Sequence, residues 1–501
     1  MTDLQVQLTA PNGRTYIQPT GLFINNEWVP SSDGKKIASI NPTNESEIVS
    51  VHAATTTDID KAVAAARAAL DSPSWRDLPA SDRGKLLYKL ADIVDEHRLT
   101  LATIETWDNG KPFTVARDED LTEVIETLRY YAGWADKTFG QVIDTTPDKF
   151  AYTIREPVGV CGQIIPWNYP LSMAAWKLGP ALACGNTVVL KPAEQTPLSI
   201  LYFANLTVKA GFPPGVINIV NGYGRIAGAA LATHPNVDKI AFTGSTATAR
   251  EIMKMASSTL KNITLETGGK SPLIVFNDAD LDLAVEWAHI GIMSNQGQIC
   301  TATSRVLVQD NVYDAFLEKF KAHTRKISKV GDPFDETTFQ GPQVTKAQYD
   351  RIMSYVDIGK AEGAKLVLGG KPATSPDAKG FFIEPTVFTD VKSQMRIYQE
   401  EVFGPFVCLM RFKTEEEALK MANETTYGLG SALFTTDLVK AHRVARRIEA
   451  GMVWINSSND SDWRIPFGGV KSSGIGRELG EEGLKAYSQV KSVHVNMKSK
   501  L

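Results

Sequence analysis

The chain has 501 residues, of which 43% are apolar and 22% are charged, and its net charge is −4. These proportions are typical of a globular protein of two or three domains, and the charge balance provides no basic field for nucleic acid. Four scattered cysteines exclude a disulfide framework and a Cys-x-x-Cys metal site, so we expect a reducing compartment and no metal. No apolar run approaches the roughly 18 residues of a membrane span, so we expect no membrane contact.

The two ends of the chain carry different targeting information. The N-terminus lacks a basic region followed by an apolar stretch, which argues against a secretory or organelle-import leader. The chain finishes with Ser499-Lys500-Leu501, and a C-terminal Ser-Lys-Leu is the tripeptide read by the peroxisomal import receptor. We therefore expect a peroxisomal protein with this receptor as a partner if the tail is exposed, and a cytoplasmic protein as the alternative.

Helical and strand-like patterns alternate along the chain, which predicts an α/β protein with mostly parallel sheets. Thr57-Asp-Ile-Asp60 is expected to cap a first helix, and a second helix is expected to open at Ser81. Residues 371–380 are rich in Pro, Ala, Asp and Lys and are typical of a surface insertion. A new strand and helix begin near 270, where we place a domain boundary. Short β-branched runs lie at 187–190, 216–220, 239–242, 263–265 and 273–276.

Two glycine-rich turns compete for a dinucleotide. Thr243-Gly-Ser-Thr246 follows a strand and opens a helix to about Ser257, so its N–H groups and hydroxyls can meet a pyrophosphate. The stretch from Gly222 to Gly228 has the better glycine spacing but lacks a hydroxyl, and the pattern alone does not choose between them. Lys191 and Glu194 follow another strand and are either ribose-binding groups or solvated loop charges.

One thiol and one carboxylate lie in glycine-rich surroundings that favour thioester chemistry. The carboxylate is in Leu265-Glu-Thr-Gly-Gly-Lys270 and the thiol in Asn295-Gln-Gly-Gln-Ile-Cys300. A thiolate can attack a carbonyl carbon, and a carboxylate of raised pKa can activate the water that releases the acyl group. The alternative for any free cysteine is a small buried hydrophobe, and we expect that role for Cys161, Cys184 and Cys408.

Eight motifs in one order make the chain closely resemble the NAD(P)-dependent aldehyde dehydrogenase superfamily, from about residue 20 to residue 497. In pattern the chain is nearest to fungal-type and aminoaldehyde-like members. The motifs are Pro166-Trp-Asn168, Trp176-Lys-Leu-Gly-Pro180, Lys191-Pro-Ala-Glu194, Phe242-Thr-Gly-Ser-Thr246, Leu265-Glu-Thr-Gly-Gly-Lys-Ser271, Gly297-Gln-Ile-Cys300, Glu400-Glu-Val-Phe-Gly-Pro405 and Pro466-Phe-Gly-Gly469.

This resemblance implies two Rossmann-like parallel-sheet domains and a small β oligomerisation arm. Residues 1–135 and 157–269 are then the dinucleotide-binding domain and 270–480 the catalytic domain. Residues 136–156 and 481–501 form the arm and the C-terminal tail. The family also implies a homotetramer or homodimer in which a hairpin from about Asp136 to Glu156 pairs with a strand around Val490 to Met497, of the same or a neighbouring subunit.

The resemblance also assigns the catalytic groups of an NAD-dependent oxidation of an aldehyde to a carboxylic acid. Cys300 is the nucleophile that forms a thiohemiacetal and then a thioester, and Asn168 with the Cys300 N–H forms the oxyanion hole. Glu266 is the general base for hydrolysis, and Lys177 supports the oxyanion side. A cofactor-free Cys acyltransferase or thioesterase is the distant alternative, because it needs the same thiol and oxyanion hole.

The cofactor expected from the resemblance is NAD. A carboxylate at Glu194 should repel a 2′-phosphate, so NAD is favoured and NADP is not excluded. Lys191 and Glu194 would hold the adenosine ribose, Ser245 the pyrophosphate and Glu401 the nicotinamide ribose. The full set of cofactor residues implied by the resemblance is Ile164, Trp167, Lys191, Glu194, Gly224, Gly244, Ser245, Glu401 and Phe403.

The substrate tunnel departs from the family pattern. Met293 and Ser294 stand where aromatic residues are common, which predicts a wider or more polar tunnel, and the loop from Ser457 to Ile465 is unusually polar. Asp460, Asp462 and Trp463 are either groups that recognise a cationic tail or a solvated rim with one packed Trp. A broad range of aliphatic aldehydes is favoured, with an aminoaldehyde or betaine aldehyde as the alternative. The expected tunnel residues are Tyr169, Met173, Trp176, Ser294, Ile299, Thr301, Trp463 and Phe467.

Overall fold

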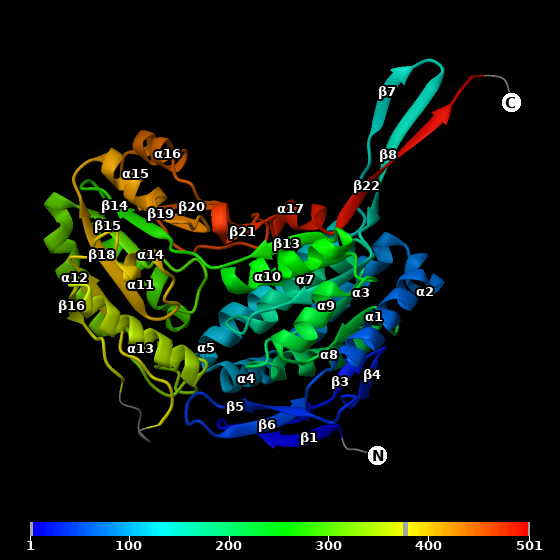
Figure 1. The fold of residues 1–501 in the computed structure, drawn as a ribbon, viewed down its shortest axis with the longest axis horizontal. Helices are drawn as coiled ribbons and strands as arrows, with labels where there is room; N and C mark the ends of the chain where they lie inside the picture. The colour runs from blue at the N-terminus through cyan, green and yellow to red at the C-terminus, as the bar shows by residue number, and fades with distance from the viewer. Residues whose placement is uncertain (1–3, 374–378, 499–501) are drawn as a thin grey trace.

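The computed structural model describes residues 4–373 and 379–498, which form two helix-covered sheets and a narrow projecting arm (Figure 1). The prediction of an α/β protein with parallel sheets is confirmed. The described part of the expected insertion, 371–373 and 379–380, is turn and isolated bridge, and the rest of it lies outside the described residues. No helix in the described ranges has the length and apolar character to cross a membrane.

The first sheet has eight strands in the order β21-β13-β12-β9-β10-β11-β3-β4. Its five central strands, β13 to β11, run parallel, which is the arrangement that helical connections produce. The strands are β3 (Leu22–Ile24), β4 (Glu27–Val29), β9 (Val160–Ile164), β10 (Thr187–Lys191), β11 (Ile217–Ile219), β12 (Lys239–Thr243), β13 (Asn262–Glu266) and β21 (Gly474–Ile475).

Helices cover both faces of the first sheet, and a separate cluster of buried apolar side chains lies on each face. The central strands are buried along their whole length, as expected for a parallel sheet covered twice. The helices of this part are α1 (Thr56–Asp71), α2 (Pro73–Arg76), α3 (Ala80–Glu96), α4 (Arg98–Asn109), α5 (Phe113–Val115), α6 (Leu121–Trp134), α7 (Pro170–Ala183), α8 (Leu198–Ala210), α9 (Ala229–Thr233) and α10 (Thr246–Ala256).

The second sheet has seven strands in the order β16-β17-β18-β15-β14-β19-β20, all parallel except β16. It also carries an apolar cluster on each face. The change of sheet falls between β13 and β14, close to residue 270, but β21 returns the chain to the first sheet near residue 474. The elements are β14 (Pro272–Val275), α11 (Leu281–Met293), β15 (Arg305–Gln309), α12 (Tyr313–Ile327), α13 (Lys346–Ala361), β16 (Lys365–Leu368), β17 (Thr386–Thr389), α14 (Arg396–Gln399), β18 (Phe406–Phe412), α15 (Glu415–Asn423), β19 (Gly430–Phe434), α16 (Leu438–Ala445) and β20 (Met452–Ile455).

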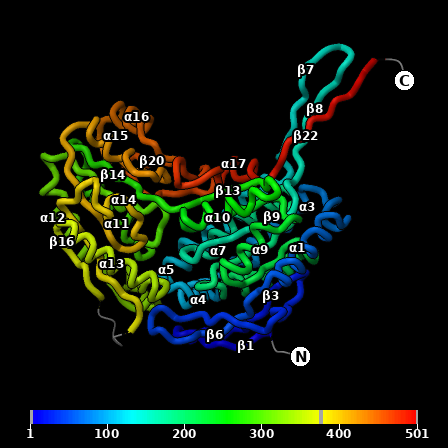
Figure 2. The backbone as a smooth tube through the Cα atoms, viewed as in Figure 1, coloured from blue at the N-terminus to red at the C-terminus, as the bar shows by residue number. Residues whose placement is uncertain are grey.

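The arm is a three-stranded antiparallel sheet that leaves the body of the molecule (Figures 1 and 2). It joins β7 (Val142–Thr146), β8 (Lys149–Pro157) and β22 (Ser488–Asn496), and helix α17 (Gly480–Lys485) leads into β22. Strand β22 pairs with β8 over its whole length, from Ser488 opposite Pro157 to Asn496 opposite Lys149. The hairpin therefore pairs with the C-terminal strand of its own chain.

Two short hairpins at the N-terminus complete the described fold, β1 (Gln5–Thr9) with β2 (Thr15–Pro19) and β5 (Lys36–Ile40) with β6 (Glu47–His52). The expected first cap was placed two residues too late, because α1 is capped by Thr55, whose N–H and hydroxyl both donate to the Asp58 carboxylate at 2.9 Å.

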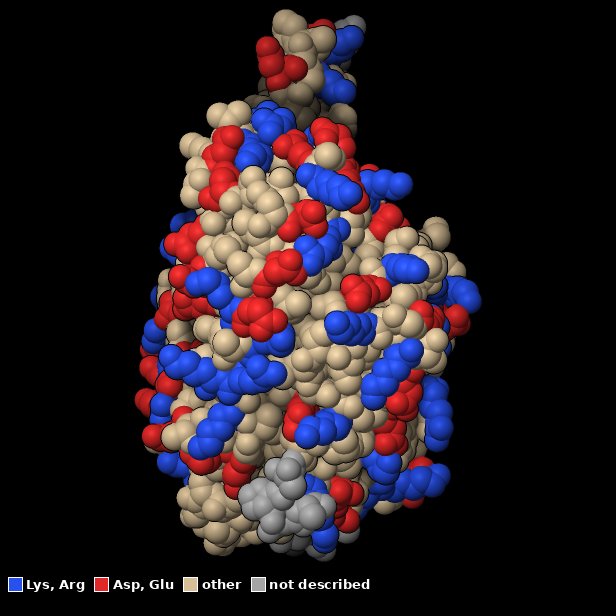
Figure 3. Space-filling model, turned by 90° about the vertical axis from the view of Figure 1, so that its left-hand side faces the viewer, with Lys and Arg blue, Asp and Glu red and all other residues tan. Residues whose placement is uncertain are grey.

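On the face shown in Figure 3, basic and acidic side chains are interspersed, as the balanced composition predicts.

Candidate active site

Strand ends of the first sheet bring several of the predicted residues to one edge. Ile164 and Lys191 are register partners at the ends of β9 and β10, and Thr243 and Glu266 are partners at the ends of β12 and β13. These strands are parallel, so their carboxyl ends share one side of the sheet, where open α/β sheets bind ligands. The predicted cofactor and base positions are therefore assembled by the fold itself.

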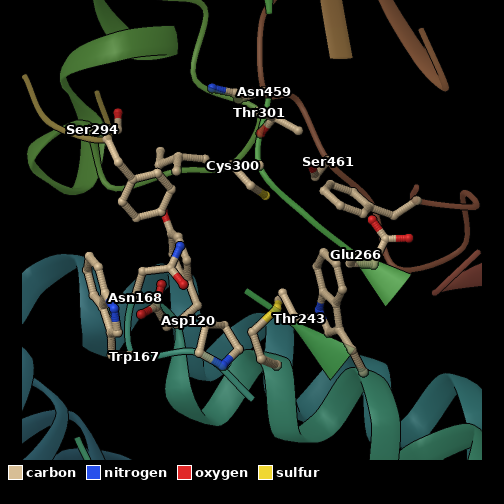
Figure 4. A pocket seen from close by; sticks show the side chains of 18 of the residues that line it. Asp120, Trp167, Asn168, Thr243, Glu266, Ser294, Cys300, Thr301, Asn459 and Ser461 are labelled. Carbon is tan, nitrogen blue, oxygen red and sulfur yellow. The ribbon is translucent and has the colours of Figure 1, made fainter. Parts of the chain in front are cut away.

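A cavity of about 530 Å³ lies over this edge and extends to the second sheet. It is lined by three of the four predicted catalytic residues, Cys300, Glu266 and Asn168, and by all eight predicted tunnel residues. Figure 4 shows the labelled side chains of both sheets around this common space. Of the predicted cofactor residues, Trp167, Gly244, Ser245, Glu401 and Phe403 line it, whereas Ile164, Lys191, Glu194 and Gly224 do not.

The loop that carries Cys300 has an unusual backbone. Asn295, Gln296 and Gly297 follow one another at φ of 47°, 58° and 70°, in the left-handed region that few residues adopt. A Cβ on Gly297 would lie 2.0 Å from the Gly404 carbonyl oxygen, so only glycine fits. The Asn295 side chain, which is buried, donates to the Asn168 carbonyl at 3.1 Å and thereby ties the loop to the first sheet.

Asn168 lies directly before α7, and its side chain is 6% exposed. Its Nδ2 donates to the Gln298 carbonyl at 2.8 Å. An amide nitrogen carries two hydrogens, so one remains for an oxygen in the cavity. The bond to Gln298 also fixes the amide relative to the Cys300 loop, which an oxyanion hole made from both segments requires.

Glu266 is a buried carboxylate, 2% exposed, and neither of its oxygens has a hydrogen-bond partner among the described residues. Burial raises its pKa well above the usual range, the Glu478 carboxylate raises it further, and Lys177 and Arg477 oppose both effects. A Cβ on Gly468 would lie 2.6 Å from Glu266 Oε1, so Gly468 leaves the space that this carboxylate occupies. An acid of raised pKa with free oxygens is suited to accept a proton from water.

Burial also raises the pKa of the Cys300 thiol, and the Glu266 and Glu401 carboxylates raise it further. The two motifs also meet through the backbone, because a Cβ on Gly269 would lie 2.5 Å from the Cys300 carbonyl oxygen. The other three cysteines are buried in the two apolar cores, which is the role expected for them.

Lys177 does not line the cavity. Its Nζ lies 2.7 Å from Glu478 Oε1 and 2.6 Å from Thr243 Oγ1, and its side chain is completely buried. This places its charge between Glu478 and Thr243, close enough to Glu266 to lower the pKa of that carboxyl. Glu478 was missed from the sequence, although it lies in a glycine-rich segment as Glu266 does.

The phosphate and nicotinamide positions lie on both sides of the cavity. Ser245 caps α10 by accepting from the Thr248 N–H at 3.2 Å, so the N–H groups of the first turn point out of the helix end. Glu401 Oε1 accepts from the Gly269 N–H at 2.9 Å, and burial raises its pKa to about 7. The rings of Trp167 and Phe403 meet edge to face with centroids 5.4 Å apart.

The remaining cofactor positions form a separate group at the same sheet edge. Lys191 Nζ lies 3.3 Å from Glu194 Oε2, and the Glu194 side chain is 30% exposed. Gly224 opens a π-helical turn that ends at Gly228, where a Cβ would lie 3.7 Å from Lys191 Cδ and 4.0 Å from Ile164 Cδ1. Both glycine-rich turns of the sequence therefore lie at this edge of the sheet.

The tunnel wall contains charges that the sequence pattern did not single out. Glu119 and Glu123 line the cavity one helical turn apart, and Glu123 Oε1 accepts from Trp176 Nε1 at 3.2 Å. Their i, i+4 spacing was the available signal. Asp462 instead pairs with Arg464, and neither Asp460 nor Asp462 lines the cavity, whereas Trp463 does. Other lining residues that the sequence did not single out are Asp118, Asp120, Thr122, Ile290, Gln348, Arg351 and Glu478.

Met293 and Ser294, the two residues that differ from the family pattern, lie in different surroundings in the structure. Ser294 lines the cavity, whereas Met293 is fully buried in the apolar core of the second sheet. Met293 therefore does not widen the tunnel.

Among the described residues no group of three or more His, Cys, Asp or Glu side chains is placed to hold a metal ion.

Comparison with known proteins gives one answer. The model of the aldehyde dehydrogenase family matches residues 28–493. The chain belongs to the aldehyde dehydrogenase family. It is 55% identical over 498 residues to an aldehyde dehydrogenase of Emericella nidulans, covering 99% of both chains. The NAD⁺ complex of a Bacillus cereus aldehyde dehydrogenase is 48% identical, with a TM-score of 0.94 and coverage of 96% of this chain and 97% of that one.

A betaine aldehyde dehydrogenase of Staphylococcus aureus in complex with NAD⁺ is also similar, at 43% identity and a TM-score of 0.94, covering 97% of this chain and 96% of that one. The family resemblance predicted from eight motifs and the aldehyde dehydrogenase fold are therefore confirmed. The protein is an oxidoreductase of this family. The individual residue roles stay predictions that rest on the geometry described above.

Proposed function

We propose that this aldehyde dehydrogenase oxidises an aldehyde to a carboxylic acid with NAD as the electron acceptor. The observation that carries the proposal is the convergence of Cys300, Asn168 and Glu266 on one cavity of about 530 Å³. These three groups supply a nucleophile, an oxyanion donor and a base, and the family has the matching chemistry.

The first half of the reaction uses the Cys300 loop and the Asn168 turn. The Cys300 thiolate bonds its sulfur to the carbonyl carbon, the carbonyl π bond breaks, and the carbonyl oxygen becomes an oxyanion. The free hydrogen of Asn168 Nδ2 and the Cys300 N–H then stabilise this oxygen, by about 3 to 4 kcal/mol for each donor. When bound, NAD supplies the two-electron acceptor that converts this adduct to a thioester.

The second half uses Glu266. Its free carboxylate takes a proton from a water molecule as the water oxygen bonds to the thioester carbon. Collapse of this second adduct breaks the carbon–sulfur bond, releases the carboxylic acid and returns the sulfur to Cys300 as a thiolate. Burial and Glu478 raise the pKa of Glu266, so its base form becomes abundant only at a higher pH than for an ordinary carboxylate.

The edge of the first sheet fits NAD. Lys191 and Glu194 present an ammonium and a partly exposed carboxylate to ribose hydroxyls, and the first turn of α10 presents N–H groups to a pyrophosphate. Glu401 keeps one oxygen bonded to the Gly269 N–H, and its carboxylate would hold the second ribose of NAD. Glu194 disfavours a 2′-phosphate, so NAD is preferred and NADP is a weaker substitute.

For the substrate we propose a broad range of aliphatic aldehydes, which the aromatic and aliphatic tunnel residues would accept. One observation favours a cationic aldehyde as the second candidate: Glu119 and Glu123 lie in the cavity wall, and burial raises the pKa of Glu123 to about 7. A cation beside this carboxylate would remove that cost of burial.

The test uses the purified full chain with NAD and either hexanal or 4-aminobutanal, with reduced-nicotinamide absorbance as the readout. The broad candidate predicts a higher kcat/KM for hexanal, and the second candidate predicts the reverse, with Glu123→Gln lowering only the 4-aminobutanal value. Cys300→Ala should abolish turnover and leave NAD binding measurable. Absence of reduced nicotinamide with varied aldehydes and with both NAD and NADP would overturn the proposed function.

We also propose that the protein is a homodimer or homotetramer assembled through the arm. The arm exposes apolar side chains that a second copy would cover, among them Phe139 at 74% exposure and Val142 at 75%. Sedimentation of the full chain and of a Val142→Asp variant tests this, since the charge should shift the protein toward monomer.

We propose peroxisomal import through Ser499-Lys500-Leu501, which lies outside the described residues, with the cytoplasm as the alternative location. Fluorescence of an N-terminally tagged chain in cells should be punctate and should become diffuse when Leu501 is removed. Diffuse fluorescence of the intact chain would reject this proposal.

A further inference from the structure

Helix α4 ends beside the turn that carries Asn168, and two of its residues bond to that turn. Asn109 Nδ2 donates to the Trp167 carbonyl at 2.6 Å, and Glu105 Oε1 accepts from the Leu171 N–H at 3.0 Å. Glu105 and Asn109 are one helical turn apart, so they face the same side of α4. Their bonds lie just before and just after Asn168 in the chain.

The bond from Asn109 fixes the peptide unit on the N-terminal side of Asn168. The Trp167 carbonyl and the Asn168 N–H belong to one planar peptide unit, so fixing the oxygen fixes the plane from which Asn168 departs. Thr196 Oγ1 is the other donor to this oxygen, at 3.5 Å, a much longer contact. Asn109 is fully buried and its Oδ1 has no partner in the described structure, so this amide is held by the bond to Trp167.

The bond from Glu105 fixes the backbone on the C-terminal side of Asn168, at the start of α7. Helix α7 begins at Pro170, and its N-cap residue Tyr169 makes no side-chain capping bond. The Leu171 N–H is one of the donors that a helix start leaves without an intrahelical partner. Glu105, 1% exposed, supplies the missing acceptor from a different helix.

The end of α4 also contacts the loop that carries the second oxyanion donor, the Cys300 N–H. Gly110, the residue that ends α4, accepts from Gln296 Nε2 at 3.2 Å through its carbonyl oxygen. Gln296 belongs to the left-handed turn that precedes Cys300. Residues 105–110 therefore contact both segments from which the oxyanion donors come.

We propose that Asn109 is a positioning residue of the oxyanion hole, with Glu105 as its supporting partner: together they hold the Asn168 amide at the distance and angle that the developing oxyanion requires. This inference rests on the proposed function. Asn109 and Glu105 touch neither substrate nor cofactor. Their loss is therefore expected to lower kcat without changing the reactivity of Cys300.

The test is a double-mutant cycle in the full chain between Asn109→Leu, which removes the donor at similar volume, and Asn168→Ala. Asn109→Leu alone should lower kcat for aldehyde oxidation by about 10- to 100-fold, somewhat less than the loss of a whole oxyanion donor. In the Asn168→Ala background the same change should cost less than about 3-fold, because the group it positions is gone.

Three further measurements separate positioning from general structural damage. Alkylation of Cys300 by iodoacetamide forms no oxyanion, so its rate in Asn109→Leu should stay within about 2-fold of the wild type. Asn218→Leu is the control for the loss of an equally buried amide on β11: Asn218 donates to the Gly215 carbonyl at 2.8 Å and the Val188 carbonyl at 3.2 Å, and it accepts from the Asn25 N–H at 2.9 Å. It should lower Tm but leave kcat unchanged. Glu105→Gln, which keeps an acceptor, should be far more active than Glu105→Ala.

An unchanged kcat in folded Asn109→Leu, or equal losses in the wild-type and Asn168→Ala backgrounds, would overturn the proposal. Equal losses in oxidation and in alkylation would overturn it as well. If Asn109→Leu does not fold, the comparison of Glu105→Gln with Glu105→Ala decides, and equal activities reject the proposal. An inactive wild type would instead reject the proposed function.

Discussion

The position of Glu266 depends on a glycine, and Gly468→Ala tests that dependence. The new Cβ would lie 2.6 Å from Glu266 Oε1, 2.8 Å from Arg477 Cδ and 2.9 Å from the Gly476 carbonyl oxygen. Ordinary contact begins at 3.4 Å, so the carboxylate must retreat by about 0.8 Å or the backbone must shift. Gly468 also has a φ of 154°, a conformation that costs an L-residue on the order of 1 to 3 kcal/mol.

A displacement of about 1 Å in a reacting group costs on the order of 10²-fold in rate, so we expect kcat of Gly468→Ala to fall by about 100-fold. Glu266 acts after the thioester has formed, so the first turnover should still release one equivalent of reduced nicotinamide in stopped-flow absorbance. The slow step should be the release of the acid.

The control is Gly363→Ala. Gly363 has a φ of 91°, and a Cβ there would meet nothing within 4 Å, so it carries backbone strain without displacing any group. This variant should lose stability but keep kcat. A folded Gly468→Ala enzyme with wild-type kcat would show that the carboxylate does not need its observed position, and it would refute the assignment of Glu266 as the base.

Three other outcomes follow from the buried charges. Glu266→Gln should keep the first-turnover burst and lower the steady-state rate by about 10²- to 10⁴-fold, the range of general-base catalysis, and a lost burst would move the base to the first half-reaction. Lys177 lowers the pKa of Glu266, so Lys177→Gln should move the rising limb of the kcat–pH profile to higher pH, and an unmoved limb would contradict this coupling. Burial raises the pKa of Asp108 from 3.8 to about 8, so its contribution to stability is complete below pH 3.8 and is lost as the pH rises toward 8, by at most about 6 kcal/mol. Asp108→Asn, which resembles the protonated acid, should therefore raise Tm relative to wild type at pH 9 but not at pH 4, and equal Tm differences at both pH values would argue against a charged Asp108.

The sequence predicted the fold class, four strands of the first sheet and the first strand of the second sheet, because β-branched runs and turn residues act locally. The expected strands at 187–190, 239–242, 263–265 and 273–276 all lie within one or two residues of β10, β12, β13 and β14. The return of β21 to the first sheet was not predicted. Gly474 and Ile475 form a two-residue strand whose pairing with Leu265 and Glu266 depends on tertiary structure and leaves no periodic pattern.

The candidate site was predicted unevenly for the same reason. Motifs identified Cys300, Glu266 and Asn168, and the structure brings them to one cavity. The place of Lys177 could not be predicted, because it depends on Glu478, which is 301 positions away in the chain. The sequence shows only that Lys177 follows Trp176, and it does not indicate that Trp176 lines the cavity whereas Lys177 is buried against Glu478.

The division of the site between two sheets explains why so many contacts hold the Asn168 turn. Asn168 follows β9 and Glu266 ends β13 in the first sheet, whereas Cys300 follows α11 of the second. A relative movement of the two sheets would separate the nucleophile from its oxyanion donor unless the segments are tied directly. The bonds from Asn168 to the Gln298 carbonyl, from Asn295 to the Asn168 carbonyl and from Gln296 to the Gly110 carbonyl make that connection. Catalytic geometry should therefore be lost by breaking these side-chain-to-backbone bonds well before either sheet unfolds.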